Sequence, residues 1–152
     1  MVSNQKQSYR ALLIFSGVWV GLVIIFALSF FEMFESPLWG RLVLAGIIGI
    51  IALFFYLGGY YYIQAEVENN KNLMIKYYNL FPVGRQFKAF KVPLQQFHHH
   101  EIKHGTAGLT SWLVLYQKMQ GGIAKYPAIG LSAFGEKGRK EISEFLKKLE
   151  NR

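Results

Sequence analysis

The sequence predicts a membrane hairpin of two helices joined to an α+β domain, in which an antiparallel sheet is capped by a C-terminal helix. Three observations predict this fold class. Two long apolar runs, residues 11–31 and 42–57, follow one another closely in the N-terminal part of the chain. Residues 60–131 contain short stretches in which polar and apolar side chains alternate, as in strands with one buried face. Residues 136–151 carry an apolar stripe at the spacing of an amphipathic helix.

The first apolar run satisfies the length requirement of a membrane span. A helix needs roughly 20 apolar residues to cross a hydrocarbon core about 30 Å thick, and residues 11–31 supply them without a charged side chain. The second span must begin near Trp39, so we expect it to cover residues 39–59. Arg41 then lies one turn inside the membrane, where its long side chain can reach back to the headgroups. A gating or proton-coupling role is the alternative, and it requires an acidic partner that neither span contains.

The short connection between the spans determines their orientation. It includes Pro37, which cannot continue a helix, so the spans must be antiparallel. Lys6 and Arg10 flank the first span, and Lys and Arg are abundant after the second, so both termini are predicted to be cytoplasmic. Aromatic side chains are then expected as belts at the two membrane surfaces, with Tyr56, Tyr60, Tyr61 and Tyr62 at the inner surface and Trp39, Phe30, Phe31 and Phe34 at the outer one.

Length and composition restrict what the rest of the chain can do. The chain has 152 residues, so a hairpin over residues 1–62 leaves residues 63–152 for one small cytoplasmic domain. The formal net charge is +8, and an excess of Lys and Arg in the cytoplasmic segments of a membrane protein explains it. The sequence has no nucleic-acid-binding motif. The chain has no cysteine, which excludes disulfides and thiolate metal sites. Because the first apolar run is long and a second follows at once, we expect no cleavable signal peptide.

Small residues form a seam along each predicted span. Gly17 and Gly21 are four residues apart in the first span, and the second has the matching set Ala45, Gly49 and Ala52. Small residues on one face allow helices to approach closely. We expect these seams to pack against each other within the hairpin, and the alternative is that one of them docks a helix of another subunit.

The region after the spans is divided by turn residues into short strands. Residues 1–9 are expected to be an extension or a frayed start of the first helix, and Gly58-Gly59 to loosen the chain where the second span ends. In the first strand Tyr61, Ile63, Ala65 and Val67 share the apolar face, and in the terminal helix Ile142, Phe145, Leu146 and Leu149 form the stripe. The predicted strands are residues 60–68, 73–81, 86–92, 98–104, 111–120, 123–126 and 127–131.

The order of six or seven antiparallel strands followed by one amphipathic helix is that of a pleckstrin-homology-like (PH-like) domain. The chain resembles small bacterial membrane proteins that carry a bacterial PH-like domain after a pair of membrane helices. The residues that carry the resemblance are the hairpin and residues 72–75, 90–94 and 141–149. The resemblance implies a curled sheet capped by the helix, an interaction module without enzymatic activity, and a place in the bacterial inner or plasma membrane. The basic residues Lys71, Lys76, Arg85 and Lys88 are the candidates for headgroup contact, but they do not reproduce the basic signature of phosphoinositide-binding PH domains.

The histidine cluster is the only local feature that suggests chemistry. His98, His100 and His104 are an even number of residues apart, so on an extended strand their side chains share one face. Imidazole binds zinc, copper or nickel. Three ligands on one short extended segment require the chain to curl, so surface histidines are the preferred interpretation and no metal or cofactor is expected. The sequence contains no Gly-x-Ser-x-Gly, no cysteine and no aspartate to orient a histidine, and its glycines are not followed by Lys-Ser or Lys-Thr.

These patterns favour a non-enzymatic accessory or scaffold protein whose PH-like domain and helices bind other subunits of a membrane complex. One alternative is a sensor module that binds anionic lipids through its basic residues. Another is a subunit of a transporter or an ion-driven motor that uses Arg41 with Glu32 or Glu35. No nucleic acid and no small-molecule substrate are expected as partners.

Overall fold

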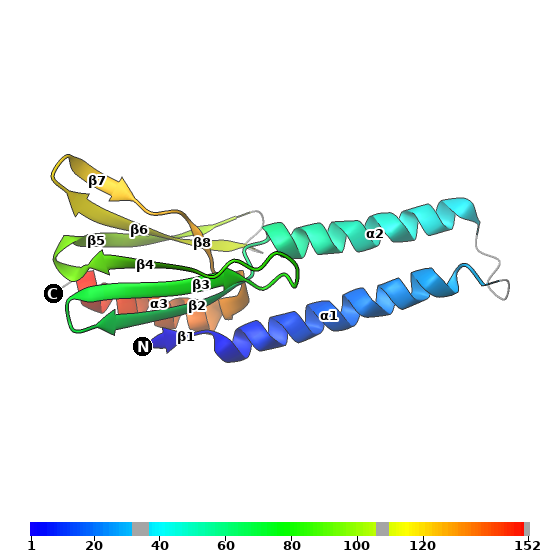
Figure 1. The fold of residues 1–152 in the computed structure, drawn as a ribbon, viewed down its shortest axis with the longest axis horizontal. Helices are drawn as coiled ribbons and strands as arrows, with labels where there is room; N and C mark the ends of the chain where they lie inside the picture. The colour runs from blue at the N-terminus through cyan, green and yellow to red at the C-terminus, as the bar shows by residue number, and fades with distance from the viewer. Residues whose placement is uncertain (32–36, 106–109, 151–152) are drawn as a thin grey trace.

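The structure, a computed structural model, describes residues 1–31, 37–105 and 110–150. Two long helices, α1 (Gln5–Leu28) and α2 (Leu38–Leu57), extend side by side from one end of a body made of strands and a third helix (Figure 1). Both are long and apolar enough to cross a membrane, and only 6 % of the most apolar stretch of each is buried. The predicted pair of long apolar helices is therefore confirmed.

The strands form two separate antiparallel sheets. The first has the order β1-β2-β3-β4, and in the second β6 pairs with β5 on one side and with β7 and β8 on the other. Their bounds are β1 Val2–Ser3, β2 Tyr61–Glu68, β3 Asn72–Asn79, β4 Lys88–Pro93, β5 Phe97–His104, β6 Ser111–Met119, β7 Gly122–Lys125 and β8 Ile129–Gly130.

The expected single curled sheet is replaced by these two sheets, which do not form a closed barrel. The change of sheet lies between β4 and β5. Pro93 ends β4 without a backbone donor, and the next residues form the 3-10 turn Leu94–Gln96, which turns β5 away from the edge of β4. The fold class is confirmed as a pair of long helices plus an α+β body, and the PH-like assignment stays a prediction.

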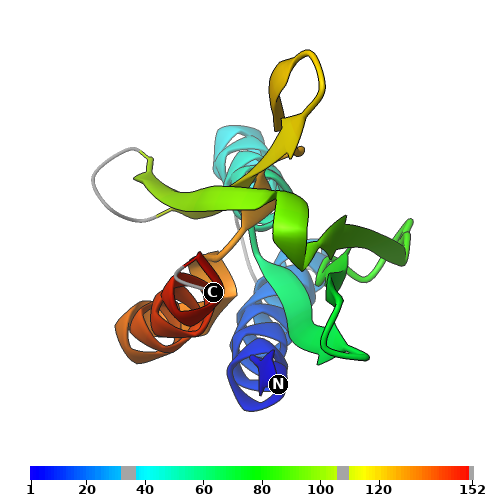
Figure 2. The ribbon, with the colours of Figure 1, turned by 90° about the vertical axis from the view of Figure 1, so that its left-hand side faces the viewer.

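The alternation of apolar residues in the strands is confirmed by their burial. Ile63 and Ala65 of β2 face Leu73 and Ile75 of β3 in a core from which water is excluded. The helix α3 (Gly135–Glu150) packs on this core through three buried residues of its predicted stripe, Ile142, Leu146 and Leu149, with Phe145 half-buried beside them. Viewed along the long helices, the two sheets and α3 surround the core (Figure 2).

The expectation for the first nine residues is confirmed for residues 5–9, which extend α1 ahead of the apolar run, and is wrong for the residues before them. Val2 and Ser3 form β1, which pairs with β2 opposite Ala65 and Gln64. Asn4 follows and is completely buried. Its amide Nδ2 donates to the carbonyl of Tyr61 at 2.8 Å, and its Oδ1 accepts the backbone N–H of Ile63 at 2.8 Å. The chain therefore enters α1 from within the first sheet.

Candidate site at the junction of the helices and the sheets

An aromatic cluster joins the two long helices to the sheets. Phe15 of α1 stacks on Phe55 of α2 with ring centroids 4.0 Å apart, and Phe55 stacks on Tyr60 at 4.7 Å. Phe81, in the loop after β3, packs against Phe15 at 6.1 Å and against Tyr56 at 5.4 Å. Such contacts are favourable beyond the area they bury. The loop after β3 is thereby held at the level of the first apolar turns of α1.

A close backbone contact reinforces this junction. After α2, Gly59 adopts a positive φ of 75° and lies against Gly130 of β8. The Gly59 carbonyl accepts the Ser132 N–H at 3.1 Å, and the Ser132 hydroxyl donates to the Gly58 carbonyl at 2.5 Å. All three glycines are buried. The expected loosening at Gly58-Gly59 is therefore wrong, because the glycines allow a tight backbone contact at this point.

The predicted membrane-interface residues occupy different environments. Tyr60 belongs to the aromatic cluster, whereas Tyr61 and Tyr62 are part of β2. Tyr61 packs against the core, and Tyr62 stacks on Tyr78 at 4.9 Å. At the far end of the long helices, Trp39 is 70 % exposed, and the Arg41 guanidinium lies 4.9 Å from the ring centroid of Phe30. Phe34 and the two carboxylates suggested as Arg41 partners, Glu32 and Glu35, lie outside the described residues.

The small-residue seams do not lie where the two long helices meet. A methyl group placed on Gly17, Gly21 or Gly49 would have no neighbouring atom within 4 Å outside its own helix backbone, Ala45 is exposed and Ala52 is half-buried. The helices contact each other through large side chains such as Phe15 and Phe55, whose stacked rings keep the backbones apart. Packing of a seam against another subunit stays a prediction.

The four basic candidates for headgroup contact are widely separated. Lys71 lies in the turn between β2 and β3, at the end of the first sheet opposite to the long helices (Figure 1). Arg85 and Lys88 lie at the other end, in and after the loop that carries Phe81. Only these two basic residues of the predicted set are therefore near the base of the long helices.

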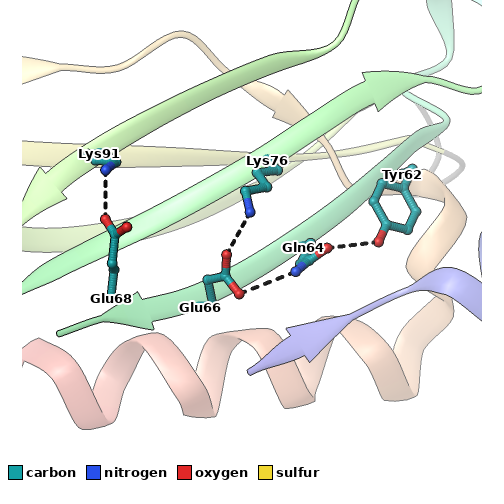
Figure 3. A network of polar contacts seen from close by, with 6 residues as sticks. All are labelled: Tyr62, Gln64, Glu66, Glu68, Lys76 and Lys91. Atoms are coloured by element: carbon teal, nitrogen blue, oxygen red, sulfur yellow. Dashed lines mark hydrogen bonds and ion pairs between the residues drawn. The ribbon is translucent and has the colours of Figure 1, made fainter. Parts of the chain in front are cut away.

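Lys76 takes part in a polar network on the outer face of the first sheet (Figure 3). Its ammonium contacts Glu66 at 2.9 Å, and Glu66 also accepts from Gln64 at 3.3 Å. The hydrogen bond from Lys76 lowers the pKa of the Glu66 carboxyl, and the same contact raises the pKa of Lys76. In the neighbouring pair, Lys91 lies 2.7 Å from Glu68. The charge of Lys76 is thus balanced within the sheet.

Two hollows flank the loop after β3. One, with a volume of about 380 Å³, lies between the first turns of α1 and Arg85 and is also lined by Tyr62 and Tyr78. The other, of about 390 Å³, lies at the end of α2 and is lined mainly by aromatic and polar side chains, among them Tyr56, Tyr77, Trp112, Asn79 and Lys88. Burial raises the pKa of the Tyr77 phenol above its ordinary value. Both hollows lie at the level where the long helices enter the sheets.

The three candidate histidines are not brought together as one cluster. His100 and His104 lie on the face of β5 turned toward α3, where His100 contacts Ser143 and His104 lines a hollow with Arg139. The strand register shifts between Phe97 and His99, and the ring of His98 packs edge-on against His99. Among the residues that the structure describes, no group of three or more His or Glu side chains is placed to hold a metal ion.

His100 makes a contact that the sequence reasoning missed. Glu150 Oε1 lies 2.6 Å from both the backbone nitrogen and Nδ1 of His100, and Nε2 lies 3.0 Å from the Ser143 hydroxyl. The sequence has no aspartate to orient a histidine, and in the structure a glutamate orients the imidazole instead. The sequence contains a sign of this contact, because Ser143 and Glu150 are seven residues apart and therefore lie on the same face of a helix.

Ser143, His100 and Glu150 are connected by hydrogen bonds in the same way as the serine, histidine and acid of a hydrolase triad. The other features of a hydrolase active site are missing around these three described residues. Ser143 lies in the interior of α3, where backbone N–H groups are used within the helix and cannot form an oxyanion hole. The His100 side chain is only 5 % exposed, which restricts access to its ring. The arrangement is suited to holding the end of α3 on the second sheet.

Replacing His100 with alanine tests this structural role. We expect His100→Ala to lower the free energy of unfolding by about 2 kcal/mol, because it leaves the partly buried Glu150 carboxylate without its ring partner. Ser143→Ala removes one hydroxyl contact and should lower it by about 1 kcal/mol or less. Urea unfolding of the purified chain in mild detergent measures both, with His98→Ala as the control. A loss as large in His98→Ala as in His100→Ala would contradict the assignment.

Comparisons with known proteins identify no relative. The chain matches no protein-family model, no curated protein and no solved structure.

Proposed function

We propose that the chain is a membrane-anchored, non-enzymatic accessory or scaffold protein. In this proposal α1 and α2 cross the bacterial inner or plasma membrane, and the PH-like α+β body binds other subunits of a membrane complex at the cytoplasmic surface. The main support for the proposal is that the α+β body is directly connected to both long helices. β1 leads directly into α1, and α2 leads through the Gly59–Gly130 contact into β2, so both helices are joined to the sheets by buried contacts.

The exposure of the helices supports a membrane location. Large apolar side chains such as Ile14, Ile25 and Ile50 are more than half exposed along α1 and α2. Exposed apolar surface is unfavourable in water by about 25 cal/mol per Å², so these helices require lipid or protein around them. Retention of α1 in the mature protein is supported by β1, because cleavage after α1 would remove Val2 and Asn4 from the first sheet.

The same contacts support the proposed orientation. Both β1 and α3 lie with the sheets, at the same end of the long helices (Figure 1). Lys6 and Arg10 are at the start of α1 on this side. The positive-inside rule therefore favours a cytoplasmic position for the sheets and for both termini.

Two exposed surfaces are suited to partner subunits. The outward faces of α1 and α2 leave Gly17 and Gly49 accessible to a close helix contact within the membrane. Away from the membrane, the β6–β7 hairpin extends from the body (Figure 2) and exposes Met119 and Ile123. β7 is also an edge strand in the described sheet and can accept an extended segment of another chain.

Isolation from native membranes tests the proposal. We expect the tagged full chain to stay in the membrane pellet after carbonate extraction and, in mild detergent, to carry a partner protein in stoichiometric amount by mass spectrometry. Ile123→Glu should reduce recovery of that partner several-fold, whereas Gln120→Glu adds the same charge in the same hairpin and should leave recovery unchanged. Release of the chain by carbonate, or a monomeric mass without a partner, would contradict the proposal.

Anionic-lipid binding is the second candidate function, and one observation favours it. Arg85 lies in the loop whose Phe81 contacts Phe15, and Lys88 directly follows that loop, so both are at the base of the long helices. Each basic residue near an anionic leaflet contributes about 1 kcal/mol of attraction.

A further inference from the structure

We infer that the hollow between the start of α1 and the loop after β3 binds the headgroup of an anionic phospholipid from the cytoplasmic leaflet. This hollow, called the headgroup pocket below, has a volume of about 380 Å³ and is lined by Gln5, Ser8, Tyr9, Leu12, Tyr78 and Arg85, among others. The inference rests on the proposed membrane crossing of α1 and α2 and specifies a lipid partner for the junction.

The level of the pocket matches that of the headgroups. Its wall on α1 runs from Gln5 to Leu12, across the point at which polar residues give way to the apolar run that begins at Ala11. The opposite wall belongs to the loop in which Phe81 contacts Phe15 and Tyr56. A headgroup in the pocket would therefore lie at the polar boundary of the span, with its acyl chains along the side of α1.

Arg85 supplies the charge of the pocket. Its Nε donates to the Phe81 carbonyl and its Nη2 to the Leu80 carbonyl, each at 3.3 Å, and its Cζ lies 5.9 Å from the ring centroid of Tyr78. These contacts hold the guanidinium in place. Within the described residues no carboxylate forms an ion pair with Arg85 or lines the pocket. A fixed, planar guanidinium without an internal counter-ion matches the geometry of a phosphate.

Ser8 is a second, independent indication that the pocket binds a polar group. It is 3 % exposed and lines the pocket, and its Oγ has no hydrogen-bond partner among the described residues. A buried hydroxyl without a partner is unfavourable, and native structures usually satisfy such groups. A headgroup oxygen, directly or through one water, would supply the missing partner.

The tip of the loop indicates that the occupant comes from a bilayer. Val83 is 73 % exposed and Phe87 is 79 % exposed, and they lie on either side of Arg85 in the sequence. Insertion of the two side chains into the membrane surface would bury them and bring Arg85 and Lys88 to the phosphate level. A soluble anion would leave both apolar side chains in water.

Lipid titration of the full chain tests the inference. The purified chain in mild detergent is titrated with phosphatidylglycerol or with phosphatidylcholine, and native mass spectrometry counts the lipids bound. We expect preferential binding of one phosphatidylglycerol, and Arg85→Gln should weaken it about tenfold or more. Lys71→Gln removes the same charge at the opposite end of the sheet and should leave the affinity unchanged.

Three results would overturn the inference. The first is equal binding of the two lipids by the unchanged chain. The second is that Arg85→Gln binds phosphatidylglycerol as tightly as the unchanged chain does. The third is displacement of the lipid by millimolar inorganic phosphate, which would indicate a site for a soluble anion. Phe87→Ser provides a second variant if Arg85→Gln fails to fold, and it should weaken lipid binding while leaving Arg85 in place. Carbonate extraction of the same variants is expected to leave them in the membrane, so failure of the lipid site is distinguishable from failure of the membrane anchor.

Discussion

Gly130→Ala is expected to lower the free energy of unfolding by about 3 kcal/mol and to weaken the connection between α2 and the sheets. A Cβ on Gly130 would lie 2.2 Å from the carbonyl oxygen of Gly59 and 2.4 Å from its Cα. Both are backbone atoms held by Ser132, so neither can move aside at low cost. The substitution would separate β8 from the end of α2.

Urea unfolding in mild detergent measures the loss of stability, and limited proteolysis between α2 and β2 reports the loosened junction. Gly121→Ala is the matched control, because Gly121 lies in the exposed turn before β7 and a methyl group there meets no atom within 4 Å. If the Gly121 and Gly130 variants were equally stable, the tight contact at the junction would be refuted.

Asn4→Ala should have an effect of similar size, with a loss of about 3 kcal/mol. The Asn4 side chain bonds to two backbone groups of β2, the Tyr61 carbonyl and the Ile63 N–H, in a completely buried position. Alanine leaves both groups without a partner, and each such buried group costs about 1–3 kcal/mol. Although Asn4 precedes α1, its side chain makes no capping hydrogen bond to that helix. The lost stability therefore comes from the first sheet and not from the end of α1.

The same unfolding experiment tests this prediction, with hydrogen exchange of the β2 amides as a local readout. We expect faster exchange at Ile63 in Asn4→Ala. Gln120→Ala in the exposed turn between β6 and β7 serves as the control and should change neither quantity. Unchanged exchange at Ile63 would show that Asn4 does not hold β1 and α1 to the sheet.

Both predictions concern how the body is fixed to the long helices, which matters for the proposed scaffold function. A body joined at β1, at Gly59–Gly130 and through Phe81 cannot rotate freely relative to α1 and α2. The loop with Arg85 and the β6–β7 hairpin are consequently presented in defined directions. A partner subunit that contacts both the helices and the sheets would meet them in one arrangement.

The sequence by itself determined the elements whose signals are local. The long apolar runs predicted α1 and α2, the alternation around Ile63 predicted β2, and the stripe containing Ile142 and Leu146 predicted α3. Each follows from the periodicity with which one chain segment presents apolar side chains to water or to a core. The stacking of strands into a body capped by α3 follows from the need to bury those faces.

Only the tertiary structure decided the contacts between segments far apart in the chain. The pairing of β1 with β2, the contact of Gly59 with Gly130 and the orientation of His100 by Glu150 each join residues separated by 50 or more positions. Two residues of β1 are too few to show a period, and a glycine pattern indicates backbone freedom without naming the partner. The small-residue seams illustrate the same point, because Phe15 and Phe55 determine how close the helices lie. Side-chain volume at the contact, which local spacing does not reveal, set that distance.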